Sequence, residues 1–424
     1  MLQAPAGDDS ISVLLCTFNG ERFLPEMLAS LAAQSAPPIE LIVGDDGSTD
    51  GTLAILEAFT TGAPFPVTIV RQPHRLGFAE NFLSLVGLTG SRYVAFADQD
   101  DVWSPTKLER IGLAVRRSGI SLVIHQASLI DEAGRPLAAR FPEIERSVIR
   151  RPLDIDPWFP AYGMTIVVDR AALEAATALG RPLSRDLDGH PLDHDEWAFL
   201  VGSATGRIAL LAEPLTNYRQ HPGNYIGAPR LGLIDRIARG LLHDEASYRS
   251  RQRLAESYAE FWERAADAGE VALPAQRCRM AATMYRRIAH RLGSRATALD
   301  RSVPLRHRVG SYIELLLGGG YAGRRRGGLG GRALIGDALR IAIPATRLSQ
   351  RPVSDPVAQR IVEERGRGRS IEQIAEALDM DGVLPPYGRS WRPEMVRDVV
   401  VGSHIATEKA AIGHDDESGS SSVV

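Results

Sequence analysis

The sequence predicts an α/β protein whose first half is built on a mainly parallel β-sheet. Over residues 1–125, short apolar runs alternate with segments of helical periodicity, and polar residues follow the apolar runs directly. Alternation of this kind predicts βαβ units, in which helices join parallel strands. No apolar run is long enough to cross a membrane, so no membrane-spanning helix is expected.

The predicted elements follow one another in a regular order. Strands are expected over 11–16, 40–44, 67–70 and 93–97, and helices over 23–34, 52–59 and 105–117. Further along, a helix over 196–203 precedes a strand over 208–211. Because ligands bind beyond the carboxyl ends of the strands in parallel sheets, the residues that follow each strand are the first candidates for a binding site.

The length of 424 residues is enough for two or three domains. We expect the α/β domain over residues 10–227, a basic and mostly helical extension over 228–350, a small helical unit over 352–402 and a disordered tail over 403–424. The clearest helices of the extension are 246–268 and 277–292. Its glycine-rich stretch 318–331 predicts a linker or loop.

The net charge of -3 conceals a basic segment. Residues 228–352 contain 23 arginines and no lysine against 11 acidic residues. Such a segment can meet anionic lipid headgroups, nucleic acid or the phosphates of a substrate, or it can form solvated helix faces. Composition alone leaves these alternatives open.

The amino-terminal sequence and the cysteines predict a cytoplasmic protein. The first residues contain neither a basic region nor an apolar run of signal-peptide length. Cys16 and Cys278 lie far apart in the sequence and do not form a disulfide framework or a zinc site by themselves. A reducing compartment fits this pattern best.

Small polar residues follow the first two predicted strands. Residues 16–21 read Cys-Thr-Phe-Asn-Gly-Glu, and residues 44–50 read Gly-Asp-Asp-Gly-Ser-Thr-Asp. Carboxylate and amide groups at these positions suit the hydrogen bonding of a nucleoside base and ribose. The alternative is a tight turn in which Ser48 or Asp50 caps the next helix.

Three carboxylates follow the fourth predicted strand, in the sequence Asp-Gln-Asp-Asp-Val-Trp at residues 98–103. Like charges this close repel one another, and a bound cation would relieve the repulsion. Hard oxygen ligands suit Mg²⁺ or Mn²⁺ bridging a diphosphate. The alternative is an exposed acidic turn before the helix that starts near Pro105.

These segments, in their order and spacing, resemble the family 2 glycosyltransferases of the GT-A fold, particularly bacterial rhamnosyltransferases with an Asp-Gln-Asp-Asp-x-Trp sequence. The resemblance covers about residues 10–225. It implies that Asp46 contacts the base, Asp98 the ribose and Asp100 the metal. It also implies a nucleotide-sugar pocket that includes Thr17, Asn19, Glu21, Gly77 and Asn81.

The sequence His-Asp-Glu-Trp at residues 194–197 matches the family's position for the catalytic base. Transfer by single displacement needs a carboxylate that takes the acceptor's proton while its oxygen attacks the anomeric carbon. The resemblance makes Asp195 that base. Glu196 stands where the family more often has a second aromatic residue. Capping of the helix by Asp193 or Asp195 is the alternative, and both roles could coexist.

The sequence Asn-Tyr-Arg-Gln-His-Pro-Gly-Asn at residues 217–224 resembles the family's closing motif. By that resemblance Arg219 neutralises diphosphate charge, and His221 ligates the metal or bonds a phosphate. The family also implies dTDP-rhamnose or a UDP-sugar as donor and a cell-envelope glycan or polyprenyl-linked precursor as acceptor. The basic extension could then rest on the inner membrane surface.

Residues 361–391 resemble the small helix-turn-helix segment of serine recombinases. Ser370 is a credible N-cap, and Ile371, Ile374, Ala375 and Leu378 lie on one helix face. A structural or protein-docking unit explains the pattern as well as DNA binding does, since the expected recognition helix is weakly charged. The alternative for the whole chain is a DNA-associated regulator that senses a nucleotide sugar.

Overall fold

The structure is a computed structural model. It describes residues 9–183, 190–221, 245–323, 327–342, 355–366, 369, 371–381, 383, 395, 396 and 399. The chain divides into two compact units, residues 1–342 and residues 343–424.

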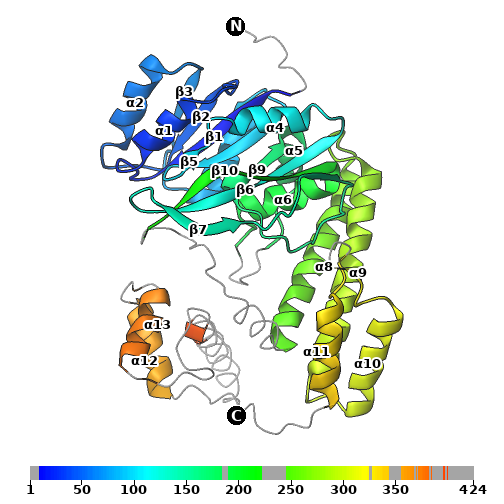
Figure 1. Ribbon diagram of the computed structural model, residues 1–424. Helices are drawn as coiled ribbons and strands as arrows, with labels where there is room; N and C mark the ends of the chain where they lie inside the picture. The colour runs from blue at the N-terminus through cyan, green and yellow to red at the C-terminus, as the bar shows by residue number, and fades with distance from the viewer. Residues whose placement is uncertain are drawn as a thin grey trace, which may run out of the picture. The chain divides into compact units, whose positions relative to one another are not determined.

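A single mixed sheet forms the centre of the first unit (Figure 1). Among the described residues its strands are β1 (Ile11–Thr17), β2 (Leu41–Asp45), β3 (Val67–Arg71), β4 (Tyr93–Asp98), β5 (Val102–Trp103), β6 (Ile120–Asp131), β7 (Pro136–Phe141), β8 (Val148–Arg150), β9 (Ile166–Asp169) and β10 (Arg207–Gln220). Their order is β3-β2-β1-β4-β9-β6-β10-β5, with β7 paired to β6 and β8 to β10.

The predicted parallel arrangement is found in the first half of the sheet. Strands β3, β2, β1 and β4 run parallel, as do β6 and β10, whereas β9 runs antiparallel to both β4 and β6. Thr17 lies opposite Asp45, and Cys16 lies opposite Asp98. The ends of β1, β2 and β4 therefore meet at one edge of the sheet.

Helices cover both faces of this sheet. They are α1 (Leu24–Ala32), α2 (Thr52–Gly62), α3 (Phe78–Leu85), α4 (Lys107–Val115), α5 (Arg170–Ala178) and α6 (His194–Thr205), with short 3₁₀ turns at Val86–Leu88 and Gly163–Thr165. Val13 and Leu15 of β1 pack with α1, α2 and α4, whereas Leu14 packs with α3, α5 and α6. Successive side chains of a strand point to opposite faces, so each strand contributes to two cores.

The helical extension packs against the α6 side of the sheet. It contains α8 (Glu245–Ala268), α9 (Ala275–Leu299), α10 (Leu305–Leu317) and α11 (Gly331–Ala342). Phe261 of α8 meets Trp197 of α6 edge to face, with ring centroids 4.9 Å apart. Figure 1 shows α8 and α9 side by side, with α10 and α11 at the end away from the sheet. Each helix in the described residues is too short or too polar to cross a bilayer.

The predicted strand over 208–211 is the start of a much longer strand. β10 continues to Gln220, with irregular register between Leu211 and Thr216, and pairs with β6 along its whole length. Polar residues and Pro214 interrupt its apolar pattern, which is why periodicity identified only its first part. The segment Asn217–Gln220 therefore lies on a strand and not in a loop.

The second unit contains α12 (Asp355–Gly366) and α13 (Ile371–Met380) in its described residues. Ile361, Ile374, Ala375 and Leu378 are buried together with Met395 and Val396. The predicted α13 face is thus a core face. Ser370, most of residues 384–400 and the predicted tail lie outside the described residues, and the recombinase-like segment stays a prediction.

Candidate functional site

Hydrogen bonds join the loops that follow β1 and β2. The hydroxyl of Thr17 donates to Asp45 (3.0 Å), the amide oxygen of Asn19 accepts from the backbone N–H of Thr49 (2.8 Å), and the carboxylate of Glu21 accepts from that of Gly51 (2.7 Å). Three predicted pocket residues therefore lie together at one edge of the sheet. In this structure their polar atoms hold the two loops against each other.

The N-cap residue of α2 is Gly51, so neither Ser48 nor Asp50 is the N-cap, although both hydrogen-bond within the turn before the helix. The carboxylate of Asp50 accepts from the backbone N–H of Thr52 at 3.0 Å and from its hydroxyl at 2.5 Å. Ser48 instead donates its hydroxyl to Asp45 at 2.5 Å. Asp50 thus satisfies a backbone donor at the start of the helix, while Ser48 braces the turn.

Hydrogen bonds also join the end of β2 to the start of α3, through Asp46, Gly77 and Asn81. The buried carboxylate of Asp46 accepts from the backbone N–H groups of Leu76 (2.6 Å) and Gly77 (2.9 Å). Gly77 has a φ of 81°, which favours glycine, and directly precedes α3. The side chain of Asn81 donates to the carbonyl of Gly44 at 2.8 Å. A carboxylate has about four acceptor sites, so two backbone donors leave Asp46 further capacity.

Gln99, the uncharged residue among the carboxylates, has a role that sequence reasoning missed. Its side-chain oxygen accepts from the backbone N–H of Phe18 (2.9 Å), and its amide nitrogen donates to the carbonyl of Phe18 (3.1 Å). A Cβ at Gly20 would lie 2.2 Å from the oxygen of Gln99. This pair of hydrogen bonds fixes the loop after β1 against the acidic loop, residues 98–101 at the end of β4. The only sequence signal for this role was an amide side chain among the carboxylates.

The three carboxylates of the acidic loop have different surroundings. Asp101 is fully buried and accepts from the backbone N–H of Arg219 at 3.2 Å, while its other oxygen has no hydrogen-bond partner in the described part of the chain. Burial, together with the charges of Asp100 and Asp195, raises the pKa of Asp98 to about 7. The predicted cluster of like charges is present, and the charge of Asp100 raises the pKa values of Asp98 and Asp101.

Lys107 provides a buried positive charge beside these carboxylates. Its Nζ donates to the carbonyl of Met164 (2.9 Å) and lies near the hydroxyl of Thr216 (3.0 Å) and over the ring of Trp103 (3.3 Å). Burial lowers the pKa of Lys107 well below its usual range, and the charge of Asp101 opposes that shift. Sequence reasoning missed this residue, although it is one of two lysines in a chain of arginines.

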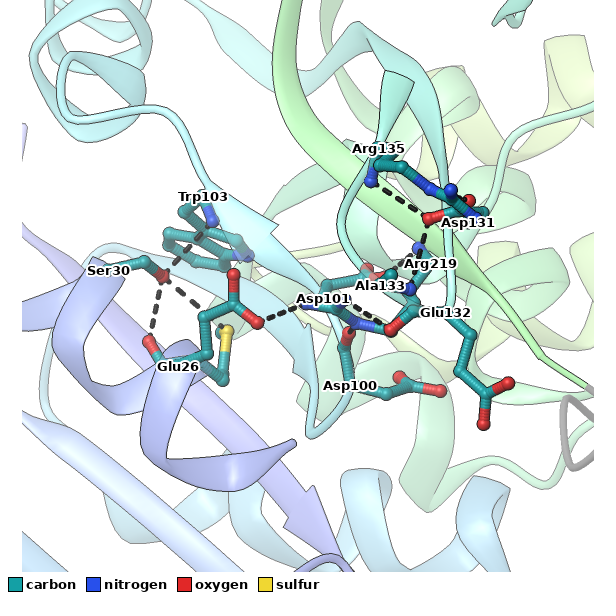
Figure 2. A network of polar contacts seen from close by, with 11 residues as sticks. Glu26, Ser30, Asp100, Asp101, Trp103, Asp131, Glu132, Ala133, Arg135 and Arg219 are labelled. Atoms are coloured by element: carbon teal, nitrogen blue, oxygen red, sulfur yellow. Dashed lines mark hydrogen bonds and ion pairs between the residues drawn. The ribbon is translucent and has the colours of Figure 1, made fainter. Parts of the chain in front are cut away.

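The end of β10 brings Arg219 and His221 to the acidic loop. The Nε2 of His221 lies 2.8 Å from Oδ2 of Asp100. The buried guanidinium of Arg219 donates to the carbonyls of Asp100 (2.8 Å) and Glu132 (3.1 Å) and pairs with Glu26, as Figure 2 shows. Arg219 therefore fixes the backbone of the acidic loop, and the predicted contact with a diphosphate stays a prediction.

Asp195 lies in the first turn of α6 and reaches the same region. Its carboxylate accepts from the backbone N–H of Glu196 at 2.7 Å, and its charge raises the pKa values of both Asp98 and Tyr162. Asp193 is the N-cap residue, yet its side chain makes no capping hydrogen bond. The structure thus brings the predicted base to the acidic loop across a long sequence separation.

His194, next to Asp195, is a core residue. Its ring stacks on Phe82 with centroids 4.3 Å apart and meets Phe96 edge to face at 5.0 Å. Burial, together with the charge of Arg181, lowers the pKa of His194 to about 3. The neutral imidazole anchors the start of α6 and so positions Asp195.

The predicted metal ligands form a pair in this structure. Asp100 and His221 are in contact, but in the described residues no three His, Cys, Asp or Glu side chains converge on one point. An oxygen donor and an imidazole nitrogen are nevertheless a set that a divalent transition ion accepts. The mutual repulsion of Asp98, Asp100 and Asp101 would also fall with a cation beside them. The donor types therefore fit a divalent metal.

Comparison with known proteins identifies this part of the chain. Residues 12–167 match Glycosyl transferase family 2. The likeness to this family is that of residues 12–167. This segment contains the loops after β1, β2 and β4, and the match together with the strand order confirms the predicted GT-A fold.

The glycosyltransferase domain has curated relatives in several bacteria. The chain is 26% identical to dTDP-rhamnosyl transferase RfbG of Shigella flexneri over 242 residues, which are 52% of this chain and 78% of that protein. It is 34% identical to an uncharacterized glycosyltransferase of Nostoc sp. over 124 residues, which are 28% of this chain and 37% of that protein. This chain therefore spans well under half of the Nostoc protein.

Among solved structures, this chain is similar to TarS of S. aureus in complex with UDP-GlcNAc. The TM-score is 0.45 at 17% sequence identity, over 74% of this chain and 93% of that one.

Proposed function

We propose that the protein is an inverting, metal-dependent glycosyltransferase that moves a sugar from a nucleoside diphosphate to an acceptor hydroxyl. The observation that carries the proposal is the convergence of Asp195, Asp98 and the Asp100–His221 pair at the ends of the strands of a family 2 domain. Inversion needs a base on one side of the anomeric carbon and charge stabilisation on the other. These residues supply both kinds of group.

In this proposal the loops after β1 and β2 bind the nucleoside. Asp46 accepts a hydrogen bond from the base with its remaining acceptor sites, and Asp98 bonds the ribose. Thr17, Asn19 and Glu21 keep the two loops together. The backbone N–H of Gly77 donates to Asp46, and Asn81 donates to the carbonyl of Gly44 at the end of β2. Arg219 contributes to diphosphate binding by holding the backbone of Asp100 in place.

Asp100 and His221 would hold the divalent cation, Mg²⁺ or Mn²⁺. A cation bound there neutralises charge that develops on the nucleoside diphosphate as it leaves. Asp195 accepts the proton of the acceptor hydroxyl as its oxygen bonds to the anomeric carbon and the bond to the diphosphate breaks.

The donor and acceptor are inferred from the relatives. RfbG is named a dTDP-rhamnosyl transferase, which supports dTDP-rhamnose as donor, and a UDP-sugar is the second candidate. The acceptor would be a cell-envelope glycan or its polyprenyl-linked precursor. We infer a cytoplasmic site of action, where nucleotide sugars are made.

Peripheral membrane contact is part of this proposal, and α10 supports it. Leu305, Val309, Ile313, Leu316 and Leu317 are all exposed. Their helical spacing puts them along one side of α10, in a segment rich in arginine. An anionic membrane would bury the apolar stripe and attract the positive charge. Ile313→Asp should weaken binding to phosphatidylglycerol vesicles, and absence of vesicle binding by the wild type at low salt would contradict this part.

The first test of the proposed function is titration calorimetry of the full chain against UDP, dTDP and GDP, with and without Mn²⁺. We expect Mn²⁺-dependent binding of UDP or dTDP that Asp100→Ala abolishes. Glu57→Ala removes an exposed carboxylate on α2 and should bind like the wild type. Absence of binding to all three diphosphates would overturn the donor-site assignment.

A further inference from the structure

A basic groove lies between α9 and α10, outside the glycosyltransferase site. Its volume is about 600 Å³. Arg286, Arg287, His290 and Arg291 of α9 line one side, and Glu314 and Leu315 of α10 line the other. Leu315 is buried, so the groove has an apolar floor beneath its charged rim.

Two side chains that line the groove, Arg286 and His290, have acidic partners. Arg286 donates two hydrogen bonds to the carboxylate of Glu263, both at 2.6 Å, and this bidentate contact fixes its guanidinium. His290 lies 3.2 Å from the carboxylate of Glu314, the acidic residue in the lining. The carboxylate of Glu263 is therefore engaged by Arg286, and Glu314 is in contact with His290.

Arg287 contributes positive charge to the groove, and Arg291 lies one helical turn from it. Arg291 donates to the backbone carbonyl of Gly327 at 3.1 Å, a neutral acceptor. Arg287 forms no ion pair with any residue in the described part of the chain. Burial and the charge of Arg287 lower the pKa of Arg291, which shows that the two guanidinium groups are close enough to repel each other.

We propose that this groove binds a phosphoryl group, as phosphate or diphosphate, through Arg287 and Arg291. The two residues are four positions apart on α9, so their side chains lie one turn apart on one face of the helix. Guanidinium groups match phosphate oxygens geometrically and remain charged when partly buried. An anion between them replaces repulsion by attraction, and Arg286, whose guanidinium is held by Glu263, lines the groove beside them.

The phosphoryl group could belong to a lipid headgroup or to a free phosphate compound. Both present the same oxygens to the arginines, and they differ in what is attached. Leu316 and Leu317 are exposed at the end of α10, next to Gly318, which lines the groove. A lipid chain could pack against these two side chains. The two sources are distinguished by experiment.

The test measures binding of the full chain to pyrophosphate by calorimetry in EDTA at low salt, and to phosphatidylglycerol and phosphatidylcholine vesicles by sedimentation. Arg287→Ala should weaken binding about 10-fold to 100-fold, because a charge-assisted hydrogen bond to phosphate is lost. Arg279→Ala, an exposed arginine of α9 outside the groove, is the matched control and should bind like the wild type.

The pattern of binding identifies the source. Arg287-dependent binding of pyrophosphate alone supports a free phosphate compound, and Arg287-dependent binding of phosphatidylglycerol vesicles supports a lipid headgroup. Equal losses in Arg287→Ala and Arg279→Ala would overturn the site, as would binding of short duplex DNA in place of both probes. Mn²⁺-dependent UDP binding should be unchanged in Arg287→Ala, so failure of the groove is distinguishable from failure of the donor site.

Discussion

The imidazole Nε2 of His221 lies 2.8 Å from Oδ2 of Asp100, although the two residues are 121 positions apart in the sequence. The contact forms because β10 runs beside the acidic loop: Asn217 of β10 pairs with Val102 of β5. His221 follows the strand directly. The length of β10 therefore decides whether a histidine reaches the acidic loop.

His221→Ala should weaken metal-dependent nucleotide binding at least about tenfold, because removing even a hydrogen-bonding partner of a metal ligand costs about 10-fold to 100-fold in metal affinity. Calorimetry of UDP or dTDP with titrated Mn²⁺ measures the change. His74→Ala, at an exposed position on a loop, is the control. Unchanged Mn²⁺ dependence in His221→Ala would remove His221 from the metal site.

Asp195→Asn should lower the turnover number of sugar transfer about 10²-fold to 10⁴-fold, since the amide cannot accept the hydroxyl proton. Binding of UDP or dTDP should be retained. Radiolabelled sugar transfer to an extracted acceptor and calorimetry measure the two quantities. Asp193→Asn, at the N-cap of the same helix, is the matched control. Equal turnover of Asp195→Asn and the wild type would rule out Asp195 as the base.

Gly44→Ala should lower the free energy of unfolding by about 1–3 kcal/mol, as overpacking of a core does. A Cβ at Gly44 would lie 2.3 Å from Oδ1 of Asn81, whose side chain is buried and held by hydrogen bonds to Gly44 and Gln72. Urea unfolding measures the change. Gly62→Ala at the end of α2 meets nothing within 4 Å and should be neutral or slightly stabilising. An equal effect of both substitutions would contradict the steric argument.

His194→Leu should reduce the dependence of stability on pH. Burial lowers the pKa of His194 to about 3, whereas the pKa of a histidine in the unfolded chain is near 6.5. As pH falls below the unfolded value, only the unfolded state takes up the proton, so folding stability is lost. Between pH 7.5 and pH 5 the wild type should lose about 2 kcal/mol more than His194→Leu.

Urea unfolding at the two pH values tests this prediction. His74→Leu removes an exposed histidine and serves as the control for the loss of one titratable group. Parallel pH profiles of the wild type and His194→Leu would show that burial of His194 does not control acid stability.

Phe261→Ala should lower the free energy of unfolding by about 3–5 kcal/mol. Phe261 is fully buried, and its ring meets Trp197 of α6 and Trp262 of α8 edge to face. Leu317→Ala, at a side chain that is 82% exposed, should change stability by less than about 0.5 kcal/mol. A small effect of Phe261→Ala would mean that the helical extension does not stabilise the helix that carries Asp195.

The sequence by itself determined the parallel half of the fold and the neighbourhood of the donor site. Short apolar runs and the periodicity between them depend on local residue order, so β1 to β4 and the helices that join them were predictable. Parallel pairing then forces the ends of β1, β2 and β4 to one edge. Asp46 and Asp98 were therefore identifiable as site candidates before any side chain was placed.

Only the tertiary structure decided what each polar side chain touches. The sequence shows three carboxylates within four residues, but burial distinguishes Asp101, beside the charge of Lys107, from Asp100, which contacts His221. The sequence likewise predicts that Arg219 neutralises the charge of a diphosphate, whereas in the structure its guanidinium donates hydrogen bonds to backbone carbonyls. These partners lie many residues away along the chain. Local sequence patterns carry no information about such contacts, because long-range strand pairing and burial create them.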